Sequence, residues 1–365
     1  MEFLTGKNIL IISPEGWGKS YLSKHHYAIE LAKSNKVWFL NPPHTPVSET
    51  ACSDLPENLR LLNDRQIPGL RHFPQRLQRF IISKQYDALE NKAGVKFQIV
   101  WNFDNSRYFH NDCFYDAYTI HHVVDAHMNY NFGIASRSAE LCLGVTQQLV
   151  QTFKKYNEHA HFIDHAFAPF DYTTYQLPQN NLRKSASYVG NLLLPALDTA
   201  LLIELAEENP DTDFYLIGSF GHNHLNVISG AKPNADLITL QNMSNVVMTG
   251  ELSFQDAFTI ASQTDIQMVP YFKTSRPMTN SSKLPFYLNN GKVIVGNEFS
   301  EHMHHGLIRM AGTAHEFKLI FSDTLDHLQY WNSEDKQHQR RQFALENTYQ
   351  KRIDYIDRLI SDSQP

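Results

Sequence analysis

The sequence predicts an α/β protein made of two doubly wound domains, each with a parallel sheet covered by helices. Short apolar segments alternate with helical segments along the chain, which is typical of βαβ units. The length of 365 residues also favours two domains over one. The alternation stops at residues 169–184, which are polar, carry two prolines and show no periodicity, and then resumes. We therefore interpret 169–184 as a linker.

Apolar runs and helical periodicity predict the elements on each side of this linker. In the first half, we expect strands at 8–13, 36–40, 96–101, 117–124 and 141–145, and helices near 20–34, 70–90 and 134–140. In the second half, we expect strands at 185–191, 212–219, 245–250, 264–271 and 291–297, and helices at 197–209, 253–262 and 335–360. The predicted domains are residues 1–168 and 185–340, and residues 341–365 form a helix that returns to the first domain.

The composition narrows the class of protein. The formal net charge of −6 argues against a nucleic-acid partner, which requires a basic surface. Cys52, Cys113 and Cys142 are odd in number and widely spaced, so they fit a reducing compartment rather than a disulfide framework. No segment reads as a signal peptide or a membrane span. We therefore expect a soluble, cytoplasmic protein.

The turn after the first predicted strand contains Gly16, Gly18 and Lys19, which suggests a phosphate loop. A P-loop, however, needs its first glycine where Ser13 stands, and Pro14 removes a backbone donor there. A dinucleotide fingerprint needs a small residue where Tyr21 stands. We therefore expect a glycine turn that faces a cleft and lets the backbone approach a diphosphate or an acceptor, with no ATP or NAD involved.

The 19 histidines raise the question of a metal site. The densest groups are "HHVVDAH" at 121–127, "GHNH" at 221–224 and "EHMHH" at 301–305. None combines an i, i+4 histidine pair with a distant carboxylate, as a hydrolytic zinc site requires. We interpret these histidines as surface or loop residues, and we expect no metal.

In open parallel sheets, ligands bind beyond the carboxyl ends of the strands. Glycine turns follow three strands of the second half, at Gly190-Asn191, Gly218-Ser219 and Gly250-Glu251. The loop after 264–271 carries hydroxyl and amide groups and ends in a lysine. Its candidate residues are Arg276, Thr279, Asn280, Ser281, Ser282 and Lys283. Hydroxyls, free N–H groups at a helix start and a cation together indicate a diphosphate site.

The order of these motifs resembles a known family. The strand-glycine turn "YVGN", the segments "DFYLIGS", "NVVMTGELS" and "TDIQMVPY", and "SSKLPFYLNNGKVIVGN" look like the nucleotide-sugar half of GT-B glycosyltransferases of the GT4-like group. "SKHHYAIELAKSNKVWFLNPP" is similar to the acceptor half of the branch that contains teichuronic-acid and capsule-type transferases. The resemblance implies two Rossmann-like domains facing a cleft.

The resemblance also implies roles for single residues. Gly190 and Asn191 would lie against the donor diphosphate. Gly218, Arg276 and Asn280 are further candidate donor-binding residues, taken from the glycine turns and the loop described above. Residues 249–252 (Thr249, Gly250, Glu251 and Leu252) would border the nucleobase, and Ser281, Ser282 and Lys283 would bind phosphate. Asp125 and His127 are the candidate catalytic pair, because a carboxylate and an imidazole can position or deprotonate an acceptor hydroxyl.

The chain departs from this family at one position. Such enzymes usually carry a glutamate that holds the donor ribose, and the alignment through Lys283 and Leu284 puts Phe286 there. No acid precedes it in "YFKTSRPMT" either. Either the donor is held in another way, or the activity is weak or absent.

Residues 69–84 carry a basic and apolar pattern in an acidic protein. Leu70, Phe73, Leu77, Phe80 and Ile81 fall on one helical face, and Arg71, Arg76, Arg79 and Lys84 fall largely on the others. Such a helix can rest on anionic lipid headgroups, which would place the protein peripherally on the inner face of the plasma membrane. Packing on its own sheet is the alternative.

Together these observations favour a metal- and cofactor-independent glycosyltransferase. It would move a hexose from a nucleotide diphosphate sugar to a glycan or lipid-linked acceptor in polysaccharide or glycolipid synthesis. One alternative is a catalytically impaired GT-B protein that binds a nucleotide sugar or a partner transferase. A sugar epimerase is disfavoured, because the chain offers no clear set of carboxylates for proton abstraction.

Overall fold

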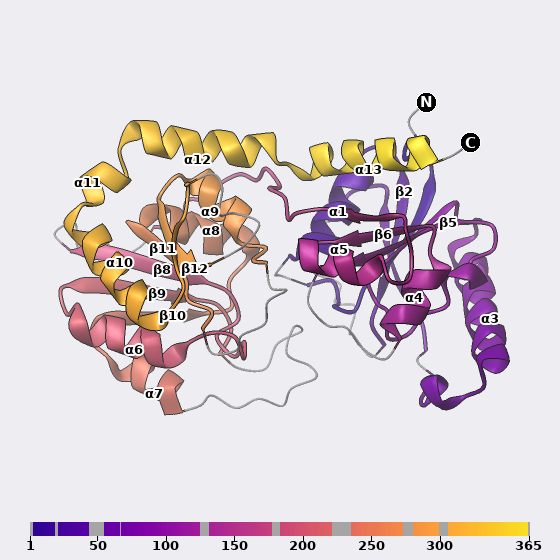
Figure 1. The fold of residues 1–365 in the computed structure, drawn as a ribbon, viewed down its shortest axis with the longest axis horizontal. Helices are drawn as coiled ribbons and strands as arrows, with labels where there is room; N and C mark the ends of the chain where they lie inside the picture. The colour runs from indigo at the N-terminus through magenta and orange to yellow at the C-terminus, as the bar shows by residue number, and fades with distance from the viewer. Residues whose placement is uncertain are drawn as a thin grey trace. The chain divides into compact units, whose positions relative to one another are not determined.

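The computed structural model describes residues 3–18, 21–43, 55–65, 67–124, 131–176, 183–220, 235–272, 280–298 and 306–363 (Figure 1). The chain forms two compact units. The first comprises Met1–His165, Pro277–Asn280 and Tyr349–Pro365, and the second comprises Ala166–Arg276 and Ser281–Thr348. Each unit is an α/β body of its own.

The first unit contains a parallel sheet in the order β3-β2-β1-β4-β5-β6-β7. Its strands are β1 (Asn8–Ile12), β2 (Lys36–Asn41), β3 (Leu59–Asn63), β4 (Ile99–Asn102), β5 (Tyr118–Val123), β6 (Leu141–Gly144) and β7 (Ala160–Phe162). All five strands predicted in the first half overlap an observed strand. The two that were not predicted, β3 and β7, lie at the edges of the sheet.

Helices cover both faces of this sheet, as a parallel sheet with apolar strands requires. They are α1 (Ser23–Leu31), α3 (Gln75–Ala93), α4 (Phe132–Ser138), α5 (Gln147–Phe153) and α13 (Tyr349–Ser363), with short 3-10 turns η1 (Leu70–His72) and η2 (Asn111–Cys113). The predicted helix at 70–90 is divided, because Pro74 occupies the N-cap position of α3. The C-terminal helix α13 packs against α1.

The second unit repeats the same plan. Its parallel sheet has the order β10-β9-β8-β11-β12-β13. The strands are β8 (Lys184–Val189), β9 (Thr212–Ile217), β10 (Val246–Gly250), β11 (Ile266–Val269), β12 (Val293–Asn297) and β13 (Arg309–Ala311). The helices are α6 (Thr199–Glu208), α7 (Ala235–Asn242), α8 (Phe254–Gln263), α9 (Leu284–Asn290), α10 (Ala314–Asp326), α11 (Leu328–Trp331) and α12 (Glu334–Glu346). The two doubly wound bodies confirm the predicted fold class.

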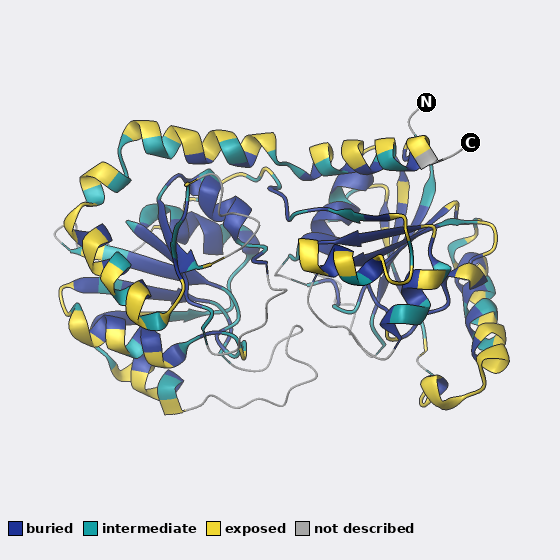
Figure 2. Ribbon diagram, in the orientation of Figure 1, coloured by how far each residue is buried: buried dark blue, intermediate teal, exposed yellow. Residues whose placement is uncertain are grey.

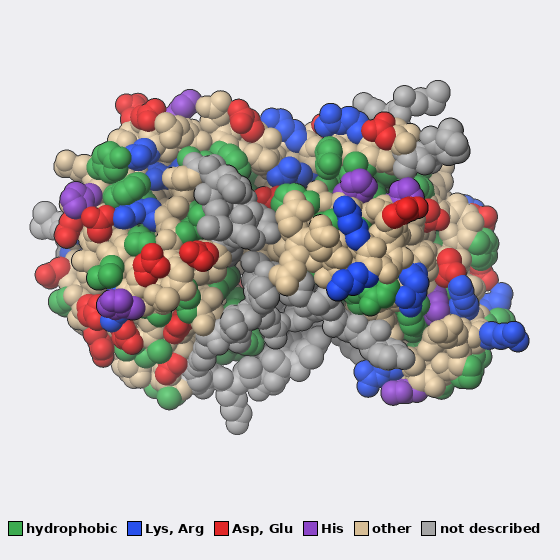
Figure 3. All heavy atoms as spheres, viewed as in Figure 1, with side chains coloured by type: hydrophobic (Ala, Val, Ile, Leu, Met, Phe, Trp, Pro, Cys, Tyr) green, Lys and Arg blue, Asp and Glu red, His purple; other side chains and the backbone are tan. Residues whose placement is uncertain are grey.

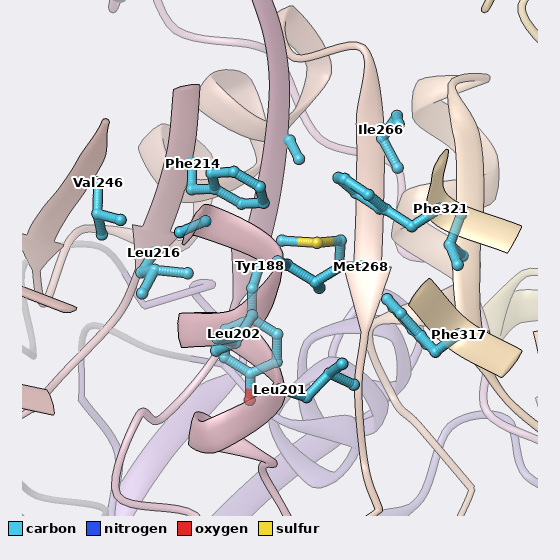
Figure 4. Close-up of a cluster of buried hydrophobic side chains, with 14 of the residues drawn as sticks. Tyr188, Leu201, Leu202, Phe214, Leu216, Val246, Ile266, Met268, Phe317 and Phe321 are labelled. Atoms are coloured by element: carbon cyan, nitrogen blue, oxygen red, sulfur yellow. The ribbon is translucent and has the colours of Figure 1, made fainter. Parts of the chain in front are cut away.

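The cores explain why these segments fold as they do. The central strands are buried on both faces, whereas the edge strands are partly exposed and the helices keep an exposed outer side (Figure 2). In the second unit, Leu201 and Leu202 of α6 and Phe317 and Phe321 of α10 point into a cluster with Phe214, Leu216, Ile266 and Met268 of the strands (Figure 4). Asp198 begins α6 by accepting a hydrogen bond from the Leu201 N–H at 3.0 Å.

One prediction about chain organisation needs correction. The helix predicted at 335–360 is broken, because Asn347 leaves the helical conformation and Thr348 forms an isolated bridge with Phe167. Residues 169–176, the described part of the predicted linker, pack on the second unit. Tyr172 donates to Asn290 Oδ1 at 2.8 Å, and Thr173 donates to Asp256 Oδ1 at 2.8 Å. Residues 177–182 lie outside the described part of the chain.

Candidate functional site

The second unit has a topological switch point at β8. This strand lies between β9 and β11, so the chain leaves it toward one side of the sheet and returns on the other. At such a point the loops after the two neighbouring strands diverge, which opens a crevice at their carboxyl ends. Gly190 and Asn191 follow β8, and Pro270 and Tyr271 follow β11, so these residues lie at the carboxyl ends of the two strands that flank the switch point.

The three glycine turns predicted after second-unit strands lie against one another. Gly190 donates its backbone N–H to the Ile217 carbonyl at 2.8 Å. A Cβ on Gly218 would lie only 1.9 Å from the Gly190 carbonyl oxygen, and both residues have φ +150°. Gly218 also forms an isolated bridge with Gly250. The close approach of these turns therefore requires glycine at position 218.

Lys283 reaches the first of these turns. A Cβ on Gly190 would lie 2.9 Å from Lys283 Nζ, so the ammonium group sits directly against the turn. Its neighbours are the rings of Tyr188 and Tyr271, with Nζ 4.2 and 4.8 Å from the ring centroids. The structure thus brings the predicted residues Gly190, Gly218, Gly250 and Lys283 together. The two tyrosines were not predicted, because a tyrosine in or after a strand reads as core.

The remaining predicted donor residues divide into two groups. Asn191, Thr249, Glu251, Leu252 and Ser282 are partly exposed on the second unit, and Ser281 there is buried. Asn280, in contrast, belongs to the first unit. Its side-chain amide donates to Asp164 Oδ1 at 2.6 Å and to the Val145 carbonyl at 3.3 Å, which gives it a structural role there. Arg276 and Thr279 lie outside the described residues.

The position expected to hold a ribose-binding glutamate faces the core. Phe286, on α9, is 3% exposed. Its ring centroid lies 4.9 Å from that of Phe258 and 5.0 Å from that of Phe254, both on α8. Phe167 and Phe170 complete this aromatic cluster, at 5.6 and 6.3 Å. Its burial explains why an aromatic residue stands here, and the chain lacks the expected carboxylate at this position.

The glycine turn of the first unit has internal partners for its backbone. The Glu15 N–H donates to Ser13 Oγ at 3.1 Å, and the Trp17 N–H donates to Asn41 Oδ1 at 2.9 Å. His25 Nε2 donates to the Gly16 carbonyl. Gly16 is buried, whereas Gly18 is partly exposed. A phosphate loop presents such N–H groups to its ligand, so this arrangement agrees with the rejection of a P-loop. Lys19 lies outside the described residues.

A buried ionic network supports this turn, and the sequence reading missed it. The guanidinium of Arg107 pairs with Asp104 at 2.6 Å and with Asp64 at 3.1 Å. It also donates to the Ser13 carbonyl at 2.8 Å and the Asn41 carbonyl at 3.2 Å. The network therefore joins the carboxyl ends of β1, β2 and β3 through charge-assisted hydrogen bonds. Its members are far apart in the sequence and form no recognisable motif.

The histidines of "HHVVDAH" are not surface residues where the structure describes them, which corrects that interpretation. His121 and His122 lie on β5 and are fully buried. The indole N–H of Trp101 donates to His122 Nδ1 at 3.2 Å, and burial lowers the pKa of both imidazoles. Asp125 and His127, the predicted catalytic pair, lie outside the described residues, as do 221–224 and 301–305. In the described part of the chain, no three His, Cys, Asp or Glu residues form a group that could hold a metal ion.

Comparison with solved structures places this two-unit arrangement among known proteins. Sucrose-phosphate synthase from Thermosynechococcus elongatus has a TM-score of 0.68 at 10% identity, and the match covers 98% of both chains. HepE from Anabaena, solved in complex with UDP and glucose, has a TM-score of 0.68 at 13% identity, covering 97% of this chain and 99% of HepE. These neighbours are GT-B glycosyltransferases. The chain has a GT-B fold.

A third GT-B protein, the pneumococcal O-GlcNAc transferase GtfA in complex with UDP and GlcNAc, has a TM-score of 0.64 at 11% identity and covers 98% of this chain and 99% of its own. The match extends over nearly the whole length of both proteins, so it includes both units of this chain. The similarity in fold therefore does not depend on one unit alone. No protein-family model matches the sequence, and no curated protein matches it. The GT4-like subgroup therefore stays a prediction.

Proposed function

We propose that this protein is a glycosyltransferase that uses a nucleotide diphosphate sugar as donor. One observation carries the proposal: the Lys283 ammonium lies against the Gly190 turn at the switch point of the second unit. A cation beside a turn without a side chain suits a diphosphate, which needs charge neutralisation and close approach of the backbone. The ligands of the GT-B proteins HepE and GtfA, UDP with glucose or GlcNAc, support the same class of donor.

The finer parts of the proposal concern the acceptor and the chemistry. We propose that the transferred sugar is a hexose and that the acceptor is a glycan or a lipid-linked molecule. Asp125 and His127 would position or deprotonate the hydroxyl of the acceptor. Lys283 can neutralise charge on the departing diphosphate, so the proposed reaction needs no metal ion or other cofactor.

Replacing Lys283 by methionine is expected to weaken binding of UDP and UDP-glucose roughly 10- to 100-fold, because a charge-assisted hydrogen bond is lost. Calorimetric titration, preceded by a thermal-shift screen of UDP-, GDP-, TDP- and CMP-sugars and ATP, measures this effect. Lys336→Met is the matched control, since Lys336 also lies over two aromatic rings, at 4.7 and 5.1 Å. Asp125→Ala should keep the affinity for the donor and lose transfer. Equal affinity of wild type and Lys283→Met would contradict the proposed site.

Phe286 favours one alternative, a GT-B protein that binds a nucleotide sugar without transferring it. Phe286 is buried, and it stands where a glutamate that would hold the ribose is expected. This alternative predicts the same loss of affinity in Lys283→Met but no consumption of UDP-glucose with any acceptor. Turnover that depends on Asp125 would exclude it.

We also propose that α3 and the turn before it rest on an anionic membrane surface. The apolar residues predicted on one face separate in the structure. Leu70 and Ile81 pack inward, whereas Phe73, Leu77 and Phe80 are 38, 43 and 60% exposed. Blue Lys and Arg side chains lie beside hydrophobic ones along this edge of the first unit (Figure 3). Among the described residues, no helix is both long and apolar enough to span a bilayer.

The full-length protein is expected to co-float with phosphatidylglycerol vesicles at low salt and to detach as salt screens the charges. Phe80→Ser should lower the partition coefficient roughly tenfold, because one exposed aromatic side chain no longer enters the interface. Leu319→Ser is the control, since Leu319 is 59% exposed on the second unit. The proposal fails if the wild-type protein does not float with the vesicles, or if Phe80→Ser and Leu319→Ser lose binding equally.

A further inference from the structure

Two tyrosines hold the ammonium group of Lys283. The ammonium donates a hydrogen bond to the Tyr271 hydroxyl and lies over the Tyr188 ring, 4.2 Å from its centroid. The two hydroxyl oxygens are 3.4 Å apart. Rings attract cations through the negative charge of their faces, and the hydroxyl adds an acceptor. Lysine has a flexible stem, so these contacts fix where its charge lies.

Tyr188 makes this arrangement rigid. Its ring is fully buried in the core of the second unit, and its hydroxyl oxygen lies at the edge of that cluster (Figure 4). A Cβ on Gly190 would lie 2.9 Å from this oxygen and 2.9 Å from Lys283 Nζ. The backbone groups nearby are already used: Gly190 donates to the Ile217 carbonyl, and Leu192 donates to the Ser219 carbonyl at 2.9 Å. These two N–H groups therefore have protein partners, and the lysine supplies the positive charge at this turn.

Tyr271 is the part of the group that follows β11. Its backbone N–H donates to Asn297 Oδ1, at 3.3 Å, which ties it to the end of β12. Its side chain is only partly buried, unlike that of Tyr188. The backbone of Tyr271 is thus fixed at one end, and its hydroxyl is bonded to Lys283 at the other. Because the lysine is already held, binding of a ligand requires less ordering of its side chain.

We propose that Tyr271 is a positioning residue that holds Lys283 for a diphosphate, so that the affinity for the diphosphate depends on the Tyr271 hydroxyl. The proposal rests on the proposed function, since it concerns the same donor site. It adds a specificity: Tyr271 contributes to binding of the phosphates and not of the nucleoside.

The test is a double-mutant cycle in the full-length protein. Calorimetry measures the affinity of UDP, uridine and inorganic pyrophosphate for the wild type, Tyr271→Phe, Lys283→Met and the double variant. Tyr271→Phe keeps the ring and removes only the hydroxyl, so the fold is retained. We expect it to weaken UDP and pyrophosphate binding about fivefold and to leave uridine binding unchanged. In the Lys283→Met background, the same change should have no further effect.

Tyr172→Phe is the matched control, because it removes a hydroxyl bonded to Asn289 and Asn290 in the same unit, and it should bind UDP as the wild type does. The inference is overturned if Tyr271→Phe binds UDP normally, if it loses uridine binding to the same degree, or if its effect persists without Lys283. A wild type that binds pyrophosphate in a Tyr271-dependent way, but not UDP, overturns the proposed function alone. A wild type that binds neither overturns both.

Discussion

Replacing Phe286 by glutamate is expected to lower the free energy of unfolding of the second unit by about 4 kcal/mol or more. The ring lies among four other phenylalanines and is 3% exposed. A carboxylate there would lose these contacts and stand without a partner in an apolar environment, where a charge is costly. Hydrogen exchange in α8 and α9, together with urea unfolding, measures the change.

Phe286→Leu separates packing from charge. Leucine keeps an apolar side chain and leaves a smaller cavity, so we expect a loss of roughly 1–2 kcal/mol. The large difference between the two variants is the expected result. If the glutamate variant is as stable as the leucine variant, its carboxylate reaches solvent or a ligand. Position 286 would then be available for a ribose contact in the donor site.

Acid is expected to destabilise the first unit well above the pH at which carboxylates titrate. Burial lowers the pKa of His26 and of His121 from 6.5 to about 3, so both imidazoles are neutral in the folded protein. The unfolded chain binds protons at these histidines below pH 6.5, and the folded chain does not. Their contribution to stability is therefore complete above about pH 6.5 and is lost as the pH falls toward 3.

At pH 5 each of the two histidines is expected to cost about 2 kcal/mol, and roughly 4 kcal/mol together. Urea unfolding followed by tryptophan fluorescence reports on this unit, because Trp17, Trp38 and Trp101 lie in it. His121→Leu should reduce the loss between pH 7 and 5 by about 2 kcal/mol, since its ring lies 5.4 Å from Phe153 and needs no charge. His338→Leu, an exposed position on α12, is the control. An unchanged slope in His121→Leu would contradict the assignment.

The strands were predictable because parallel sheets bury both faces, which leaves continuous apolar runs such as "NILII" of β1 and "IQMV" of β11. The sequence reading missed β3, whose burial alternates at Leu59, Arg60 and Leu61, and β7, which is only three residues long. It also joined α12 to α13, because the apolar spacing continues across Asn347 and only the backbone conformation there ends the first helix.

The candidate site was predictable where backbone conformation demands glycine, and less so where side chains meet. Gly190 and Gly218 follow apolar strands, and Lys283 precedes a helix, so their positions could be read along the chain. Lys283 lies between Tyr188 and Tyr271, and Tyr188 is 95 positions away from it in the sequence (283 minus 188). Such a contact cannot be read along the chain. Arg107 and Asp64 are a similar case. The role of each site residue in binding stays a prediction.

The division of the chain between the units has a consequence for biosynthesis. Tyr349, Ile353, Ile356 and Ile360 of α13 are buried in the first unit, where Tyr349 lies beside His26 and Tyr27 of α1. A ribosome makes α1 before the second unit and α13 after it. The first unit therefore cannot cover this part of its core until the second unit has been synthesised, and a nascent chain exposes it throughout that interval.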